Sequence, residues 1–404
     1  MQKHFYLLDG VQNFPHGMLA VPKDFREPNF FWDVYNQLGH FDDFSINNFY
    51  NLNRVDILPK DSTKFIVSFL QTPQHNIPAL SKDALSLLRN DPKVFLVLFN
   101  VLEYNQNEQP LINYLKKENI PPLKTVVLVS NPDYHEKVID GIIFLSINFW
   151  ESFTRYHLKL MPDISYITPD ERIKTINNAN RKFLSLNRNV KLHRIWWFYS
   201  ILKTEMLNQG HVSYHIPKLL TSEEYNEIID SPNMLHYIPT NLHQDFKVNG
   251  RRQMYARMLD KIDNNRDVIN YNNTIKPYYA DSLMSFVTES DHRGNFITEK
   301  TYKAIVNMHP FFIVGNPDHH ALLRVRGYHT FENLFGSEKI TTFDDATAVL
   351  TRLKNTDIED LKTIINKRII DKLVHNYELF WNRKTSWNSI TDEVLNILEK
   401  HKNE

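Results

Sequence analysis

A Thr-Glu-Lys sequence at residues 298–300 offers the clearest chemistry in this chain. Thr298 is placed to cap a helix, and Glu299 and Lys300 would then lie in its first turn. Free backbone N–H groups and the helix dipole favour an anion at such a position, and a phosphate is the natural guest. The sequence therefore predicts an anion-binding helix start, although a Glu-Lys pair also marks many solvated helix starts.

Two apolar segments would position this turn. Residues 311–314 have the continuous apolar character of a buried parallel strand, and Gly315 follows them. Upstream, residues 281–288 form another candidate strand, which Glu289 follows directly. Because open α/β sheets bind ligands at the carboxyl ends of their strands, we expect a ligand site at this edge.

A second strand-to-helix turn carries further polar residues. Residues 182–202 have the pattern of an apolar strand, a polar turn and a long amphipathic helix, with Asn187, Arg188 and Arg194 around the turn. An arginine at a helix start presents a planar fork that suits a diphosphate. A surface arginine without a ligand is the alternative that the sequence leaves open.

Together these segments resemble the fucosyltransferase-like glycosyltransferases, the α1,3-fucosyltransferase family and its bacterial and viral relatives. The resemblance covers roughly residues 182–331, and its motifs are the strand ending at Glu289, the Phe-Ile-Thr-Glu-Lys block at 296–300 and Arg194. It implies a GT-B fold, in which two Rossmann-like, doubly wound α/β domains face a cleft. The expected donor-binding residues are Asn187, Arg188, Arg194, Glu289, Thr298, Glu299, Lys300 and Gly315.

The implied reaction is an inverting, metal-independent transfer of a hexosyl or pentosyl group from a nucleotide diphosphate to an acceptor hydroxyl. The resemblance places Lys300 on phosphate and Glu299 on the ribose hydroxyls. Such a transfer needs a base for the attacking hydroxyl, which in the resembled family is a glutamate of the first domain near a strand end. Glu103 is the best-placed candidate and Asp9 is its rival, with an idle carboxylate as the alternative for both.

Composition limits the classes of function. The 404 residues include 47 basic and 47 acidic side chains, so no net field draws the chain to nucleic acid or to an anionic membrane. The absence of cysteine excludes disulfides, thiolate zinc sites and thiol nucleophiles. Because His309, His319 and His320 lack the partners of a metal site, we expect no metal and no cofactor beyond the nucleotide sugar.

The first half of the chain alternates apolar runs with helix-capable segments, which predicts βαβ units in a parallel sheet. We expect an acceptor-side α/β domain over residues 1–175 and a donor-binding α/β domain over residues 176–375. A C-terminal helix, 376–404, is expected to pack back on the first domain. The expected strands include 64–70, 94–101, 125–129, 141–147, 183–187, 281–288, 311–315 and a short one at 339–343.

The sequence contains no run of about 18 apolar residues and no signal-peptide pattern. We therefore expect no membrane span and a cytoplasmic enzyme of bacterial or viral type, in the host cytoplasm if viral. The expected acceptor is a glycan or a lipid-linked sugar. Two alternatives stay open: a viral enzyme that glycosylates hydroxymethylated bases in DNA, with a basic rim at Arg251 and Arg252, and a noncatalytic nucleotide-binding module.

Overall fold

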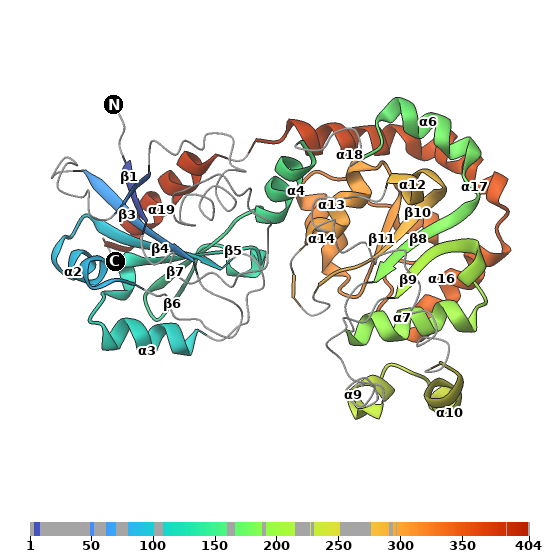
Figure 1. Ribbon diagram of the computed structural model, residues 1–404, viewed down its shortest axis with the longest axis horizontal. Helices are drawn as coiled ribbons and strands as arrows, with labels where there is room; N and C mark the ends of the chain where they lie inside the picture. Colours follow the sequence, from blue (N-terminus) through green and yellow to red (C-terminus); the bar gives the residue numbers. More distant parts are fainter. Residues whose placement is uncertain are drawn as a thin grey trace, which may run out of the picture. The chain divides into compact units, whose positions relative to one another are not determined.

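Two compact units make up the chain, the first formed by residues 1–156 and 384–404 and the second by residues 157–383. The sequence interpretation set its boundaries at 175/176 and 375/376. Figure 1 shows the computed structural model, in which each unit has its own sheet. The structure describes residues 4–8, 49–51, 62–69, 80–100, 108–159, 166–187, 191–214, 227, 230–250, 276–290, 294–295, 297–384 and 386–402.

The first unit is built on a seven-stranded sheet with the order β2-β1-β3-β4-β5-β7-β6. Its neighbouring strands run parallel except for β6 and β7, which are antiparallel. The inner strands β4 and β5 are buried along their whole length, which explains their uninterrupted apolar sequences. The strands are β1 His4–Leu8, β2 Phe49–Asn51, β3 Thr63–Phe69, β4 Val94–Asn100, β5 Thr125–Val129, β6 Lys137–Ile139 and β7 Ile142–Ser146.

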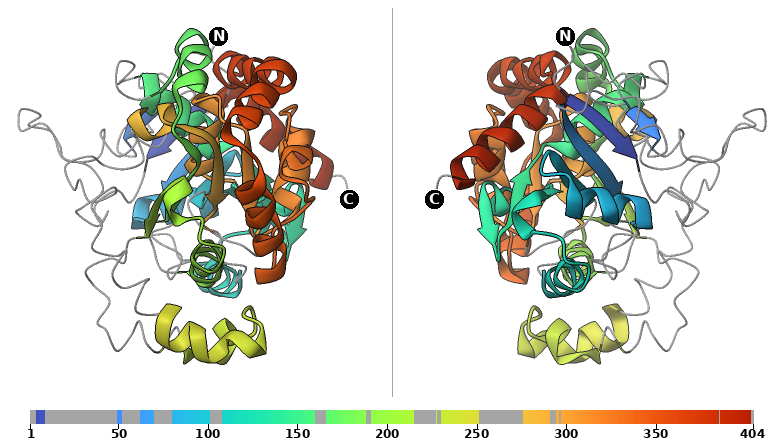
Figure 2. Two further views of the ribbon diagram at one scale, coloured as in Figure 1. Left: turned by 90° about the vertical axis from the view of Figure 1, so that its right-hand side faces the viewer. Right: turned by 90° about the vertical axis from the view of Figure 1, so that its left-hand side faces the viewer.

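Helices cover both faces of this sheet. The crossovers β3-α2-β4 and β4-α3-β5 advance in one direction, so right-handed connections place α2 (Lys82–Asn90) and α3 (Gln109–Lys117) on one face. Figure 2 shows the C-terminal helix α19 (Trp387–Lys402) on the opposite side. Its buried side chains are Ile390, Thr391, Val394, Ile397 and Leu398.

The second unit has a four-stranded, fully parallel sheet with the order β11-β10-β8-β9. The chain passes from β8 through α7 to β9, and from β10 through α13 to β11. Because these two right-handed crossovers advance in opposite directions, α7 and α13 lie on opposite faces, as Figure 1 shows. The strands are β8 Arg181–Asn187, β9 Gly210–Tyr214, β10 Ser282–Thr288 and β11 Phe311–Val314.

The two longest helices of the second unit, α16 (Phe343–Asn355) and α18 (Ile370–Asn382), follow β11 in the sequence. Among the described residues, none of the helices combines the length and apolar character that crossing a membrane requires. Helix α4 (Phe149–Lys159) contains the unit boundary at residues 156/157. The remaining helices are α6 Pro169–Asn178, α7 Leu192–Lys203, α9 Pro232–Leu235, α10 His243–Asp245, α12 Lys276–Ala280, α13 Glu299–Val306, α14 Asp318–Val325, α15 Glu332–Phe335, α16 Phe343–Asn355, α17 Ile358–Ile364 and α18 Ile370–Asn382.

The predicted α/β class is confirmed, because both units are built on largely parallel sheets with crossover helices. The strand predicted at residues 339–343 is wrong. This segment is a loop that leads into α16, with Thr342 as N-cap. Thr342 and Asp345 form a capping box, in which each side chain accepts a hydrogen bond from the backbone N–H of the other residue. The β-branched sequence is therefore used to start a helix.

Candidate functional site

The carboxyl ends of β8 and β10 mark the point where the strand order of the second sheet reverses. From β8 the chain crosses to one side of the sheet, and from β10 it crosses to the other. In open α/β sheets this reversal leaves a crevice outside the strand ends, which is where ligands bind. The residues with predicted donor contacts follow these two strands, so the topology brings the two sequence motifs to one place.

Asn187, the last residue of β8, joins three strand ends. Its side-chain oxygen accepts a 2.7 Å hydrogen bond from the hydroxyl of Thr288 on β10, and its amide nitrogen donates to the carbonyl of Ser213 on β9 at 3.2 Å. The residue is buried, with 1% exposure. Its amide therefore holds the edge of the sheet together, while the donor contact predicted for Asn187 stays a prediction.

Arg194 lies in the first turn of α7 and connects this helix to β10 across the reversal point. Its Nη2 donates hydrogen bonds to the carbonyl oxygens of Thr288 and Glu289, at 3.1 and 3.0 Å. The neighbouring His193 contacts the same Glu289 carbonyl through Nε2 at 2.9 Å. Both side chains are buried. Arg194 thus positions the end of β10, and its contact with a diphosphate stays a prediction.

Glu289 directs its carboxylate at the start of α13. One oxygen accepts from the backbone N–H of Thr298 at 3.2 Å and from the Thr301 hydroxyl at 2.5 Å. The other accepts from the Thr298 hydroxyl and from the N–H of Ser290. With 1% exposure, this carboxylate is fully occupied by the protein. It orients the helix start on which an anion site would depend.

Lys300 is the cationic side chain of the Thr-Glu-Lys turn. Thr298 is the N-cap of α13, as predicted. The ammonium group of Lys300 donates to Glu299 Oε1 at 2.7 Å, to Ser290 Oγ at 2.9 Å and to Thr298 Oγ1 at 3.1 Å. Its side chain retains 27% exposure, whereas that of Glu299 retains 7%. The charged end of Lys300 therefore lies beside the helix N-terminus with access to solvent.

The Glu299 carboxylate is ionised despite its burial. Burial alone would raise its pKa, but the positive charges of Lys300 and Lys303, together with hydrogen bonds from Lys300 and from its own backbone N–H, hold the pKa below its ordinary value. A buried, ionised carboxylate is a strong acceptor for hydroxyl groups. The contact of Glu299 with ribose hydroxyls, which the family resemblance implies, stays a prediction.

Lys191 belongs to this site but was missed by the sequence analysis. It is the residue before α7, and its ammonium group donates to the backbone carbonyl of Ser290. Ser290 thus accepts a hydrogen bond from Lys191 on one side of the reversal point and another from Lys300 on the other side. The available signal was a lysine at the last position of a strand-to-helix turn. Among the described residues here, the cationic side chains of Lys191, Arg194, Lys300 and Lys303 outnumber the carboxylates of Glu289 and Glu299.

Gly315 directly follows β11 and has a backbone conformation that suits glycine, with φ 125°. Its N–H donates to the carbonyl of Ile340 at 2.9 Å. The next residue, Asn316, donates to the carbonyl of Gly294 at 3.3 Å, and His319 contacts the same carbonyl at 3.0 Å. The bonds of Asn316 and His319 attach Gly294, which follows β10, to the segment after β11. Gly315 itself contributes to this edge of the sheet only through its backbone N–H.

All three candidate histidines contact protein groups, and His309, which precedes β11, lies at the edge opposite the strand ends described above. His309 is buried between the Ser285 hydroxyl and the Tyr279 carbonyl, at 2.9 and 2.8 Å, and burial lowers its pKa well below the ordinary value. His320 accepts a hydrogen bond from the Ile313 N–H at 3.0 Å, and burial lowers its pKa to about 4. The neutral His320 ring therefore fixes the start of α14 against β11.

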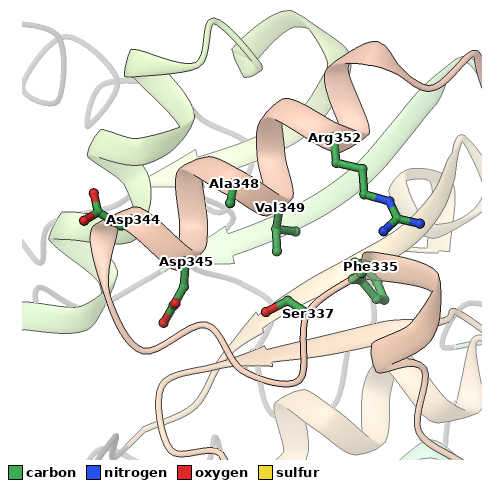
Figure 3. A pocket seen from close by; sticks show the side chains of 8 residues that line it. Phe335, Ser337, Asp344, Asp345, Ala348, Val349 and Arg352 are labelled. Atoms are coloured by element: carbon green, nitrogen blue, oxygen red, sulfur yellow. The ribbon is translucent and has the colours of Figure 1, made fainter.

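A shallow recess of about 280 Å³ lies beside α15 and α16, as Figure 3 shows. Asp344 and Asp345, an Asp-Asp pair that superficially resembles a metal-binding motif, lie in the first turn of α16. Asp345 accepts hydrogen bonds from Thr341 and Thr342, and Asp344 points away from Arg352 in the figure. We place no ligand in this recess, whose lining includes none of the strand-end residues described above. It is lined by Phe335, Gly336, Ser337, Asp344, Asp345, Ala348, Val349 and Arg352.

Three predicted site residues, Glu103, Asp9 and Arg188, lie outside the described residues. The strands that precede the two candidate bases, β1 and β4, belong to the same parallel sheet, so they end at the same edge. The candidate basic rim at Arg251 and Arg252 also falls outside the described part of the chain. The choice of catalytic base stays a prediction.

Comparisons with known proteins identify no family. No family model matches the chain, and no curated protein matches it in sequence. An α,α-trehalose-phosphate synthase (UDP-forming) from Burkholderia vietnamiensis is 10% identical, with a TM-score of 0.38, covering 85% of this chain and 76% of that one. A trehalose-6-phosphate structure from E. coli bound with UDP-2-fluoro glucose is 8% identical, with a TM-score of 0.40, covering 99% of this chain and 98% of that one. Similarity at this level supports no conclusion about function.

Proposed function

We propose that the chain is a glycosyltransferase that moves a sugar from a nucleoside-diphosphate donor to an acceptor hydroxyl. The observation that carries the proposal is the convergence of Lys191 and Lys300 on Ser290 at the reversal point of the second sheet. Two cationic side chains reach this point from opposite faces of the sheet, beside the N-terminus of α13. A diphosphate matches this arrangement because its charge suits both the lysines and the helix dipole.

The site residues take distinct roles in this proposal. Lys300 and Lys191 bind the diphosphate, with a phosphate oxygen replacing their contacts to Ser290. Glu299 accepts hydrogen bonds from the ribose hydroxyls, in agreement with the fucosyltransferase-like motif. Glu289 and Arg194 keep the start of α13 and the end of β10 in place, as their hydrogen bonds to these elements suggest.

The transfer is proposed to be inverting and metal-independent, as the fucosyltransferase-like motif implies. Negative charge develops on the diphosphate as the bond to the sugar breaks, and preorganised cations and helix N–H groups stabilise it in the transition state. Lys300 is already held in place by Glu299 and Thr298, so little reorganisation is needed. The base that removes the acceptor proton is proposed to come from the first unit, with Glu103 before Asp9. The acceptor is proposed to be a glycan or a lipid-linked sugar.

The first test is donor binding. Thermal unfolding is measured with GDP, UDP, CDP and dTDP, with and without Mg²⁺, for the native chain, Lys300→Ala and Lys339→Ala. A ligand at a hundredfold excess over Kd stabilises the folded state by about 2.7 kcal/mol. We expect one nucleotide to stabilise the native chain and Lys339→Ala without Mg²⁺. Lys339 is the matched control because it is an exposed lysine of the same unit.

For Lys300→Ala we expect a loss of affinity of about 10–100-fold, the value of one or two charge-assisted hydrogen bonds. Unchanged affinity in Lys300→Ala would contradict the site assignment. Donor binding without sugar transfer to any hydroxyl acceptor would favour the noncatalytic nucleotide-binding module. Activity on hydroxymethylated DNA, with a steep salt dependence, would favour the DNA-modifying alternative.

A further inference from the structure

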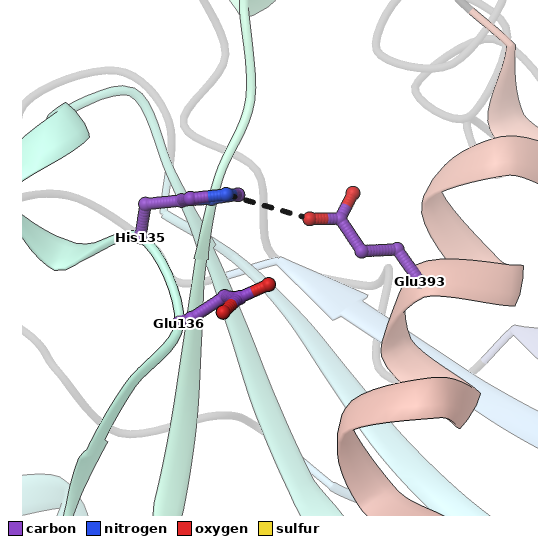
Figure 4. Close-up of side chains that lie close together, drawn as sticks. All are labelled: His135, Glu136 and Glu393. Carbon is purple, nitrogen blue, oxygen red and sulfur yellow. Dashed lines mark ion pairs between the residues drawn. The ribbon is translucent and has the colours of Figure 1, made fainter.

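A group of three metal-binding side chains lies on the first unit, on elements that the proposed sugar transfer does not use. His135 and Glu136 occupy the turn before β6, and Glu393 projects from α19, as Figure 4 shows. The His135 Nε2 and Glu393 Oε1 atoms are 3.6 Å apart. One ligand atom from each of the three residues lies within 4.8 Å of the other two. Among the described residues, this is the one histidine and carboxylate group that meets this criterion.

The donor set of one imidazole nitrogen and two carboxylate oxygens indicates the class of metal. Zn²⁺ binds histidine nitrogen at about 2.0–2.1 Å and carboxylate oxygen at about 2.0–2.2 Å, which puts ligand atoms of a tetrahedral site roughly 3.4 Å apart. The 3.6 Å separation of His135 and Glu393 is already close to this value. Mg²⁺ and Ca²⁺ prefer oxygen ligands throughout, so the imidazole favours Zn²⁺ over them.

The electrostatics of the group also favour a cation. Two carboxylates face each other around one imidazole, and Glu393 is partly withdrawn from solvent, with 40% side-chain exposure. The nearest cationic residue in the sequence, Lys137, places its ammonium group 5.2 Å from the ring centre of Tyr134. Both His135 and Glu136 are exposed, so their side chains can adjust around an ion and water can complete its coordination.

We propose that His135, Glu136 and Glu393 form a Zn²⁺ site that attaches the C-terminal helix α19 to the β6 edge of the first sheet. The two sides of the site are far apart in the sequence, because the turn follows β5 while α19 ends the described chain. An ion that bridges them stabilises the docked position of α19. The role of the site is structural, and it uses none of the residues of the proposed donor site in the second unit.

The test is a calorimetric titration of the full chain with Zn²⁺, repeated for His135→Ala, Glu393→Gln and Asp140→Asn. Asp140 is the matched control, because it is an exposed carboxylate in the next turn along the chain. We expect one Zn²⁺ per chain, bound at least tenfold more weakly by the first two variants and unchanged in the third. All variants should unfold at the same temperature without metal, since the substituted side chains are exposed or partly exposed.

Hydrogen exchange adds a readout that is specific for the bridge. At a Zn²⁺ concentration near the Kd of the native chain, Zn²⁺ should slow exchange in α19 and β6 of the native chain and of Asp140→Asn, and should slow it much less in His135→Ala. Bound Co²⁺ should give the visible spectrum of a four- or five-coordinate ion with nitrogen and oxygen ligands. Failure to bind Zn²⁺, or equal affinity in the native chain and His135→Ala, would overturn the site. Equal exchange of α19 with and without Zn²⁺ would overturn the bridge.

Discussion

The Glu289 carboxylate provides the most direct test of how the candidate site is built. Each of its oxygens accepts one hydroxyl and one backbone N–H. In a Glu289→Gln variant, one oxygen becomes an NH₂ group. The hydroxyls of Thr298 and Thr301 can then reverse their roles and accept from this amide, but a backbone N–H cannot. One buried N–H is therefore left facing another donor.

The expected cost follows from this arrangement. An unsatisfied buried donor costs about 1–3 kcal/mol, and loss of a carboxylate at a helix N-terminus adds about 0.3–1 kcal/mol. We expect Glu289→Gln to destabilise the start of α13 by the sum of these two costs, about 1–4 kcal/mol. Native-state hydrogen exchange of the α13 amides is the appropriate assay, because it reports the free energy of local opening in this helix rather than in the whole chain.

A double-mutant cycle with Thr301→Val identifies the cause. Valine has the shape of threonine but lacks the hydroxyl, and Thr301 is fully buried. If the Thr301 hydroxyl acts through Glu289, Thr301→Val should cost about 1 kcal/mol less in the Glu289→Gln background than in the native chain. Additive costs, or an opening free energy of α13 that changes by less than about 0.5 kcal/mol in Glu289→Gln, would refute the reasoning.

Two further predictions concern β11 and the segment that follows it. His320 is buried and its pKa is about 4, below the value of about 6.5 for an unfolded histidine. Between these two pH values the unfolded state binds more protons than the folded state. The free energy of unfolding should therefore fall as the pH drops from about 6.5 to about 4. The His320→Gln variant loses the titrating group but keeps a side-chain acceptor for the Ile313 N–H. In a plot of denaturation midpoint against pH, this variant should show a smaller slope between about pH 6.5 and about pH 4. A slope equal to that of the native chain would contradict the role of His320. Gly315→Ala should destabilise the second unit by about 1–3 kcal/mol, because φ at this position is 125°; chemical denaturation measures the change, and an unaltered midpoint would argue against strain.

The central strands were the most predictable part of the fold. Residues 125–129 were expected as a strand and form β5 over the same residues, and residues 94–100 of the run expected at 94–101 form β4, with residue 101 outside the described part of the chain. Parallel strands that are covered on both faces need apolar side chains at every position, so the pattern is continuous. Edge strands give a weaker signal. The antiparallel strand β6 has exposed side chains at Lys137 and Val138 and was not predicted.

Two errors in the second unit have local physical causes. Strand β9 begins at Gly210, and glycine is uncommon in strands, which weakens the pattern. Here the absence of a side chain is required, because a Cβ atom at this position would collide with the ring of Phe183 on β8. At residues 339–343, β-branched residues resemble a strand, but the capping box of Thr342 and Asp345 starts α16 instead. Side-chain hydrogen bonds decided the structure where propensity alone was misleading.

The candidate site shows where prediction from the sequence ends. The motifs identify helix starts and their charged residues, because capping and charge are local properties of the sequence. The side-chain partners depend on the strand order, which pairs residues about a hundred positions apart, such as Arg194 with Glu289 and Asn187 with Thr288. From the sequence, Arg194 is as good a phosphate ligand as Lys300, and Lys191 has no special role. In the structure Arg194 is buried against β10, whereas Lys191 and Lys300 meet at Ser290. Because only a long-range pairing distinguishes a cation that supports the site from one that can bind a ligand, the two lysines are the residues on which the proposed donor chemistry depends.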